Sequence, residues 1–393
     1  MQQMVKRSDI QEAIRKINDI EKQLSENVFV EMAEEIHGIA LAQVSNSNAL
    51  FLGDPGVGKS FLVIQWAKRI LGGKYFEWLI DAFTVPEQIA GHISLKKLQE
   101  DVMERNIENT ICDATHVFLD EIWKGNNGVI NFLLRIMNER KYYNNNKAHK
   151  APILVLVGAS NEIPEAGDHL EAAYDRFVLK YYVNTIVEDS NWIKMMDNYL
   201  SGFKGEETTI TIDEIKLLQE AARLVEIPLP VKRAIVTIKN SLEVSHGIRV
   251  SPRVINNSLR IIQAQALLSG KDIADEEDLE VLRHTLWKDK DEANVIHREI
   301  LKYTFPDKEK LANEETLIAA LQAEIKDFKL RSTSGVEDLR KLMGLAAQAK
   351  DIKSRVETIK RDLFEKKRST KSADTLLQKC TSLIRLITDE IGS

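Results

Sequence analysis

Hydrophobic positions in the first half of the chain alternate between two spacings. Continuous apolar runs at Ala49–Leu52, Val117–Leu119 and Ile153–Val157 have the length of buried strands. Between them, as at Gly128–Arg140, apolar residues recur every three or four positions, which is typical of helices. Strands alternating with helices need crossover connections, so we expect an α/β fold with a parallel sheet and helices on both faces. A further amphipathic helix comes first, and its apolar face consists of Ile10, Ile14, Ile17, Ile20 and Leu24.

The strand signals stop after about residue 205. The helices expected next cover Asp213–Val225, Val231–Val244, Pro252–Ser269 and Glu276–Leu286. From Asp291 onward three apolar stripes favour a helical hairpin or a three-helix bundle. The stripes are Leu317, Leu321, Ile325 and Phe328; Leu339, Leu342, Ala349, Ile352, Val356, Ile359 and Leu363; and Leu376, Leu383, Ile387 and Ile391. We therefore expect an α/β domain at residues 1–204, an all-α domain at 205–290 and an all-α extension at 291–393.

Two smaller features lie inside the predicted α/β domain. A charged helix is expected around Lys96–Arg105, within a stretch that also contains short strands. The segment Lys141–Lys150 contains Asn144, Asn145 and Asn146, residues that favour a tight turn. It therefore predicts a β-hairpin.

The composition narrows the class of protein. The chain has 393 residues, 44% of them hydrophobic, which is enough for the cores of two or three domains. Its formal charge of −6 excludes a surface that is basic throughout, so nucleic acid is not the expected partner. Two cysteines, Cys112 and Cys380, are too few for a disulfide scaffold and fit a reducing compartment. Since no apolar run approaches the roughly 20 residues of a membrane-spanning helix, we expect a cytoplasmic protein without membrane insertion.

The most specific motif is a glycine-rich segment between a predicted strand and a predicted helix. It matches the pattern G-x-x-x-x-G-K-[ST] in full and consists of Gly53, Asp54, Pro55, Gly56, Val57, Gly58, Lys59 and Ser60. Gly56 and Gly58 allow positive φ, so that successive N–H groups can surround phosphate oxygens. Lys59 can reach the outer phosphates of ATP, and the Ser60 hydroxyl can bind Mg²⁺.

Polar residues at two other strand ends complete the predicted site. The strand Val117–Leu119 runs into Asp120 and Glu121, and the third strand runs into Asn161. The carboxyl ends of parallel strands meet at one edge of a sheet, so these side chains are expected beside the phosphate loop. Asp120 would hold Mg²⁺ through water, Glu121 would polarise the attacking water, and Asn161 could hold that water or contact the γ-phosphate. This division of roles suits ATP hydrolysis.

Taken together, these motifs resemble the AAA+ ATPases, and within them the MoxR group, closest to its RavA branch. The resemblance covers roughly residues 8–288. It rests on strings that match in order and spacing, namely Val117–Lys124, Asn138–Arg140, Ala159–Ala166, Leu170–Phe177, Phe83–Gly91 and Leu286–Trp287. It departs after residue 290, because RavA-like proteins carry a β-rich inserted module there and this chain shows only helical patterns.

The resemblance assigns roles that the residues alone do not. It implies that Asn161 is sensor 1 and that Arg253, in the helical lid, is sensor 2 and contacts the γ-phosphate. It implies that Arg176 is an arginine finger acting on the ATP of the neighbouring subunit, a contribution of about 10³–10⁵ in rate in such enzymes. A finger that acts in trans couples hydrolysis to assembly, so a ring, a homo-hexamer, is expected.

The resemblance also suggests partners. MoxR ATPases commonly work with a von Willebrand A-type protein, so we expect a ring ATPase that remodels or chaperones a protein client. The hairpin Lys141–Lys150 and the insert Phe83–Gly91 would face the pore or the client. A nucleic-acid motor is the first alternative, because Lys141, Lys147 and Lys150 could line a basic pore. A nucleotide-switched structural ring with little turnover is the second.

Overall fold

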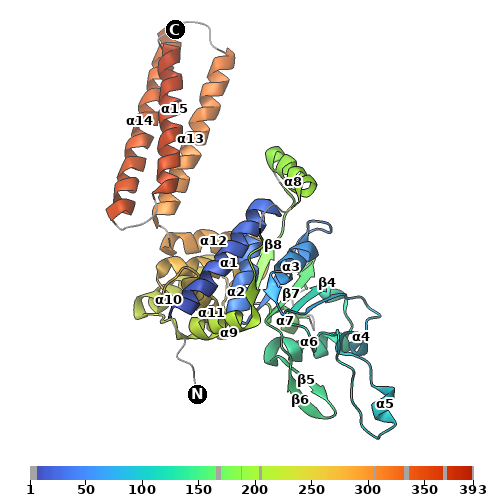
Figure 1. Cartoon of the computed structure of the whole chain (residues 1–393). Coiled ribbons are helices and arrows are strands. Elements are labelled where there is room, and N and C mark those ends of the chain that lie inside the picture. Colours follow the sequence, from blue (N-terminus) through green and yellow to red (C-terminus); the bar gives the residue numbers. More distant parts are fainter. Residues whose placement is uncertain are drawn as a thin grey trace. The chain divides into compact units, whose positions relative to one another are not determined.

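Figure 1 shows the computed structural model of the chain, which describes residues 7–164, 170–186, 188–202, 206–304, 306–331, 336–365 and 370–391. The chain folds into two compact units, Met1–His297 and Arg298–Ser393. The domain boundaries predicted after residues 204 and 290 stay predictions. Glu165 and Ala166, which belong to one of the strings of the family resemblance, lie outside the described residues. No helix in the described ranges has both the length and the apolar character that crossing a membrane requires.

A parallel sheet forms the centre of the first unit, which confirms the predicted α/β class. Its strands are β1 (Asn48–Leu52), β3 (Tyr75–Leu79), β4 (His116–Asp120), β7 (Val155–Ser160) and β8 (Leu179–Tyr182). They lie in the order β3-β4-β7-β1-β8. The strand predicted at Ile153–Val157 begins and ends later than expected. Gly158 belongs to it because it pairs with Leu50 of β1 and Leu119 of β4, and the ring of Phe177 leaves no room for a side chain at this position.

Helices precede and follow the phosphate-loop strand β1 along the chain. They are α1 (Arg7–Asn27), α2 (Ala33–Ser45), α3 (Lys59–Ala67) and α6 (Asn127–Glu139). On α1 the residues Ile14, Ile17, Ile20 and Leu24 are buried, as the helical spacing predicts. Helix α2 packs on β1, β7 and β8, so the strand that leads into the phosphate loop is buried along its whole length.

The segment between β3 and β4 corrects one prediction. The expected charged helix around Lys96–Arg105 is only the short α5 (Leu95–Leu98), which follows α4 (Pro86–Ala90). The chain reverses after α5, where Asp101 has a φ of 56°. A backbone hydrogen bond from the Ser94 N–H to the Glu104 carbonyl, 2.8 Å long, then closes the segment into a loop. Pairing across this loop, rather than charge pattern, decides its conformation.

The predicted hairpin at Lys141–Lys150 is confirmed. Strand β5 (Lys141–Asn144) pairs in antiparallel register with β6 (Lys147–Lys150). Asn145 and Asn146 have φ values of 47° and 56°, as a two-residue turn of type I′ requires.

The rest of the first unit is mainly helical. Its elements are α7 (Glu171–Tyr174), α8 (Asp189–Ser201), α9 (Ile212–Leu224), α10 (Leu229–His246), α11 (Pro252–Leu268), the 3₁₀ helix η2 (Glu276–His284) and α12 (Lys290–Thr304), which reaches into the second unit. One strand does occur after residue 205, because β9 (Ile210–Thr211) pairs with β2 (Ile70–Leu71). Two residues are too short to leave an alternating pattern. The α-helix expected at Glu276–Leu286 is a 3₁₀ helix whose first turn Asp275 and Asp278 cap tightly.

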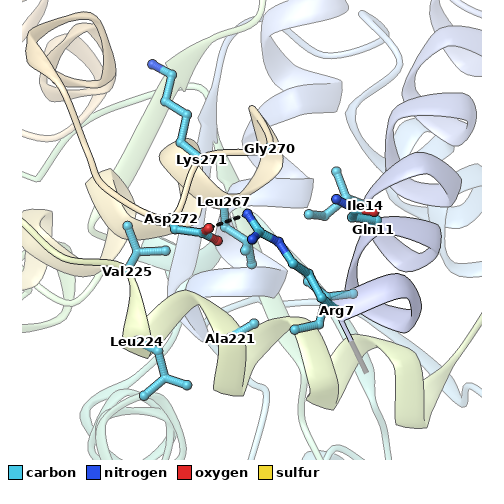
Figure 2. Close-up of a pocket in the computed structure, with 11 residues that line it drawn as sticks. Arg7, Gln11, Ile14, Ala221, Leu224, Val225, Leu267, Gly270, Lys271 and Asp272 are labelled. Carbon is cyan, nitrogen blue, oxygen red and sulfur yellow. Dashed lines mark hydrogen bonds and ion pairs between the residues drawn. The ribbon is translucent and has the colours of Figure 1, made fainter. Parts of the chain in front are cut away.

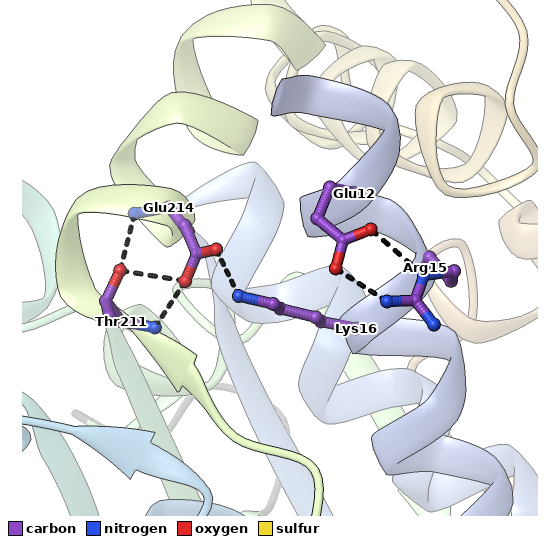
Figure 3. Close-up of polar contacts among 5 residues, drawn as sticks. All are labelled: Glu12, Arg15, Lys16, Thr211 and Glu214. Carbon is purple, nitrogen blue, oxygen red and sulfur yellow. Dashed lines mark hydrogen bonds and ion pairs between the residues drawn. The ribbon is translucent and has the colours of Figure 1, made fainter. Parts of the chain in front are cut away.

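Figure 3 shows how α9 begins and how α1 is attached to it. The Thr211 hydroxyl oxygen accepts a bond from the Glu214 N–H at 3.2 Å, and the Glu214 carboxylate accepts one from the Thr211 N–H at 2.8 Å. The other Glu214 oxygen lies 2.6 Å from the ammonium of Lys16 on α1. This reciprocal cap satisfies two amide donors at the helix start.

The second unit contains a three-helix bundle of α13 (Pro306–Arg331), α14 (Val336–Glu365) and α15 (Lys371–Ile391). This decides between the hairpin and the bundle that the stripes left open. Most predicted stripe residues with a described side chain are in the core. Leu317 is the exception, being 45% exposed, and Ile318 is buried in its place. Ile318 follows Leu311 by seven residues and precedes Leu321 by three, so these side chains share one helix face.

Candidate functional site

The glycine-rich loop joins the carboxyl end of β1 to α3. Gly56 and Gly58 have φ values of 84° and 93°, the left-handed region that favours glycine. Gly53 is needed for a different reason, because a Cβ there would lie 2.2 Å from the carbonyl oxygen of Val183. The loop can therefore approach β8 closely and turn its N–H groups toward an anion at the start of α3.

Lys59 is buried at the base of this loop. Its Nζ donates to the carbonyl oxygens of Gly53 at 2.6 Å and Asp54 at 3.0 Å. Burial lowers the pKa of this ammonium, and the carboxylates of Asp120, Glu121 and Asp54 oppose that shift. Since charged oxygens bind an ammonium more strongly than carbonyls do, Lys59 is placed to exchange these partners for a phosphate.

Two carboxylates follow at the end of β4. The Asp120 side chain accepts a bond from the Glu121 N–H at 3.0 Å. Glu121 adopts φ 51° and ψ 42°, so its side chain turns away from the strand direction. Its Oε2 is buried, lies 3.3 Å from the Lys124 ammonium, and has no hydrogen-bond partner among the described residues. A carboxylate oxygen with a free lone pair is what the activation of a water molecule requires.

Asn161 lies directly after β7 and is exposed. The register places Leu52, the last residue of β1, opposite Ser160, the last residue of β7. The Gly53 N–H donates to the Ser160 carbonyl at 3.0 Å, which ties the loop to this strand end. Because β4 also runs parallel beside β7, Asp120 ends at the same edge of the sheet. The structure thus brings the loop, the carboxylates and Asn161 to one edge.

A cavity beside the loop was not predicted from the sequence. It has a volume of about 500 Å³ and is lined by the loop, by Phe29 and Val30 after α1, by Phe61 of α3, and by Trp192 and Tyr199 of α8. The rings of Phe29 and Phe61 lie 5.4 Å apart. An apolar, aromatic wall next to a phosphate loop suits a flat heteroaromatic base. Its residues come from distant segments, so no local pattern could have identified it.

Arg176 lies at the opposite edge of the sheet. Its carbonyl oxygen accepts a bond of 3.0 Å from the side-chain amide of Asn48, the first residue of β1. At about 3.3 Å per residue, β1 separates that point from the phosphate loop by about 15 Å. The guanidinium donates to the Ala172 carbonyl, while its Nε is buried with no hydrogen-bond partner in the described part of the chain. Arg176 therefore does not face the phosphate loop of its own subunit.

Arg253 lies beside Arg176 rather than beside the loop. It is in the first turn of α11, and its guanidinium donates to the Asn138 side chain, in the last turn of α6, at 3.4 Å. The neighbouring Met137 carbonyl accepts a bond from the Asn48 side chain. The Asn48 amide donates to the carbonyl oxygens of both Met137 and Arg176, so the helix end that Arg253 contacts and the turn that carries Arg176 meet at one edge. Burial lowers the pKa of Arg176, and the charge of Arg253 lowers it further. Sequence reasoning placed both arginines near phosphate but could not show that they share an edge.

Figure 2 shows a second cavity, of about 230 Å³, between α1, α9 and α11. An ion pair between Arg7 and Asp272 crosses it, and Ile14, Leu224 and Leu267 are among its apolar lining residues. The described lining includes none of the site residues predicted from the sequence. This groove is therefore separate from the phosphate loop.

Comparisons with known proteins agree with this arrangement. A family model described as the MoxR domain in the MoxR-vWA-beta-propeller ternary systems matches residues 15–222. A model of an AAA lid domain matches residues 230–300, the part of the chain that carries Arg253.

Relatives extend over most of the chain. The uncharacterized proteins MJ0079 and MJ0812 of Methanocaldococcus jannaschii are 33% and 36% identical to it. The first alignment covers 93% of this chain and 95% of the relative, the second 83% and 88%. A candidate ATPase from Cytophaga hutchinsonii has a similar fold, with a TM-score of 0.61 and 16% identity, over 75% of this chain and 96% of that one. The closer similarity to the RavA branch stays a prediction. The family matches and the fold agree that the chain belongs to the MoxR group of the AAA+ ATPases.

Proposed function

We propose that this chain hydrolyses ATP at the interfaces between the subunits of a homo-oligomeric ring, a hexamer by family resemblance. One observation carries the proposal. Each subunit carries the phosphate loop and Glu121 at one edge of its sheet, and Arg176 and Arg253 at the opposite edge, near Asn48. When copies are arranged head to tail, the arginine edge of one subunit faces the loop edge of the next.

Within one subunit the residues divide the work. The loop N–H groups and Lys59 hold the phosphates, while Ser60 and Asp120 would hold Mg²⁺, which neutralises phosphate charge when it is bound. Glu121 takes up a proton from the attacking water through Oε2, which accepts no hydrogen bond in the described part of the chain, and Asn161 orients that water. The cavity at Phe29 and Trp192 holds the base.

Arg176 and Arg253 then act on the neighbour's nucleotide. Both arginines lie at the sheet edge that carries Asn48, and the charge of Arg253 lowers the pKa of Arg176. A γ-phosphate supplied by the adjacent subunit would offset the repulsion between the two positive charges. Arg253 therefore serves the neighbouring site, whereas a lid arginine of the usual kind would contact the nucleotide of its own subunit.

The first test concerns chemistry. Glu121→Gln should bind ATP with unchanged affinity and lose hydrolysis by at least 10²-fold, because the amide cannot accept the proton. Glu220→Gln, an exposed position of α9, is the matched control and should keep full activity. An active Glu121→Gln variant would contradict the role assigned to Glu121.

The second test concerns geometry and uses mixtures of inactive subunits. A Glu121→Gln subunit still supplies its arginines, and an Arg176→Ala subunit still supplies an intact loop edge. Random mixing at equal amounts should therefore restore about one quarter of the interfaces (one half times one half) if the arginine acts in trans. Arg253→Ala should complement Glu121→Gln in the same way. Complementation by Arg176→Ala but not by Arg253→Ala would place Arg253 in its own subunit's site.

We further propose that hydrolysis remodels a protein client together with a von Willebrand A-type partner. The family model that matches is defined by systems containing such a partner. The insert between β3 and β4 supports a client-binding role, because Phe83 is 89% and Leu95 75% exposed. A von Willebrand A-type protein from the same organism should co-purify with Glu121→Gln in the presence of ATP, and much less of it should do so when Lys59→Ala weakens ATP binding.

A further inference from the structure

An aromatic cluster lies between the two edges of the sheet. It consists of Trp123 in the 3₁₀ helix η1 (Ile122–Lys124), which directly follows Glu121, and of Tyr174 and Phe177. The Trp123 ring lies 6.0 Å from the Tyr174 ring and 5.8 Å from the Phe177 ring, measured between ring centres. All three side chains are at least 93% buried.

The two partners of Trp123 flank the arginine. Tyr174, Arg176 and Phe177 belong to one tight turn, in which the Phe177 N–H donates to the Tyr174 carbonyl at 3.0 Å. The Tyr174 hydroxyl donates to the Lys288 carbonyl at 2.6 Å, which fixes that ring from the other side. The rings therefore determine where the backbone that carries Arg176 lies.

Strand β7, which leads to Asn161, contacts the same cluster. A Cβ at Gly158 of β7 would lie 2.6 Å from the Phe177 ring and 3.3 Å from Ile122. Gly158 precedes Asn161 by three residues, and Ile122 follows Glu121. The strand ends that carry Glu121 and Asn161 are therefore closely packed against the turn that carries Arg176, and a shift in one displaces the other.

We propose that Trp123 is a positioning residue for Arg176, and that through it the state of a subunit's own nucleotide site governs how that subunit presents its arginine to the neighbour. The proposal rests on the function proposed above. A movement of Glu121 or η1 shifts Trp123, and Trp123 cannot move without displacing Tyr174 or Phe177. Sites on the two sides of one subunit are then coupled through its interior.

The test measures how well a subunit supplies Arg176 to its neighbour, separately from ATP hydrolysis at its own site. Glu121→Gln subunits act as donors, since they supply only the arginines, and Arg176→Ala subunits act as acceptors, since they supply only the loop edge. Trp123→Leu in the donor should lower the restored ATPase activity at least tenfold. The loss caused by the same change in the acceptor should be at least five times smaller. Trp123→Phe in the donor should keep at least half of the activity, because a ring still reaches both partners.

Two further variants keep the test decisive. Gly158→Ala in the donor adds a methyl group that displaces Phe177, the neighbour of Arg176, and leaves Trp123 unsubstituted. It should also reduce the restored activity. Trp78→Leu on β3, a tryptophan outside the cluster, should not. Each donor must bind ATP as its parent does, which shows that it is folded; if Trp123→Leu fails this check, Gly158→Ala decides.

The outcomes separate this proposal from the function on which it rests. If parent donor and acceptor do not restore activity, the assignment of Arg176 in trans is overturned, and this inference with it. If they do, and Trp123→Leu and Gly158→Ala donors restore activity equally well, only the positioning role is overturned. Equal losses from Trp123→Leu in donor and acceptor would also overturn it, because they indicate a general structural role.

Discussion

At the scale of single residues, one buried carboxyl group leads us to expect that the free energy of unfolding depends on pH. Glu35 on α2 is only 7% exposed, and burial raises its pKa to about 7 from an ordinary value of 4.5. Below pH 4.5 the group is protonated in both the folded and the unfolded chain. As the pH rises toward 7, only the unfolded chain releases the proton, so the free energy of unfolding falls. At 1.36 kcal/mol per pKa unit, the loss above pH 7 reaches about 3 kcal/mol.

Glu35→Gln should remove this dependence. We expect the unfolding free energy of the variant, relative to the natural chain, to rise by up to about 3 kcal/mol between pH 4.5 and pH 8. Thermal unfolding of both proteins across this range measures the difference, with Glu220→Gln as an exposed control. Parallel pH profiles for Glu35→Gln and the natural chain would mean that Glu35 is ionised in the folded state.

At the scale of elements, the start of α9 offers a test of the reciprocal cap in Figure 3. Thr211→Ala removes the oxygen that accepts the Glu214 N–H and should cost about 1 kcal/mol of stability. Thr211→Ser keeps this oxygen and should cost much less. Denaturant unfolding followed by far-ultraviolet circular dichroism compares the two. Equal destabilisation by both substitutions would show that the lost methyl group matters and the cap does not.

The elements also show which features a sequence pattern can predict. The helix α1 and the hairpin β5–β6 follow from contacts between near neighbours, so spacing and turn residues sufficed. The loop around Asp101 is closed by a pairing between Ser94 and Glu104, and charge pattern carries no information about such a pairing. A glycine at position 158 suggests a loop, yet Gly158 belongs to β7 because it pairs with both β1 and β4, strands that are distant in the sequence.

At the scale of the whole molecule, the same distinction separates the two halves of the site. The phosphate loop and Glu121 could be predicted because their residues are contiguous and need only a local conformation. The placement of Arg176 and Arg253 at one edge depends on the start of α11 meeting the end of α6, where Arg253 contacts Asn138, 115 residues away in the sequence. The aromatic cavity depends on α8 returning to the loop. Arrangements of this kind follow from tertiary packing, and no periodicity in one sequence encodes them.

The division into two compact units predicts that nucleotide binding does not need the bundle. Every residue assigned to the loop, the cavity and the arginine edge lies within residues 7–297. A chain that ends at Thr304 keeps α12 whole and should bind ATP with an affinity within about twofold of the full chain, measured by calorimetry, since no assigned contact is lost. Lys59→Ala in both lengths is the matched control and should weaken binding at least tenfold, because a charged hydrogen bond is worth about 1.5–3 kcal/mol. A shortened chain that unfolds in one cooperative transition but no longer binds ATP would show that residues 305–393 support the nucleotide site.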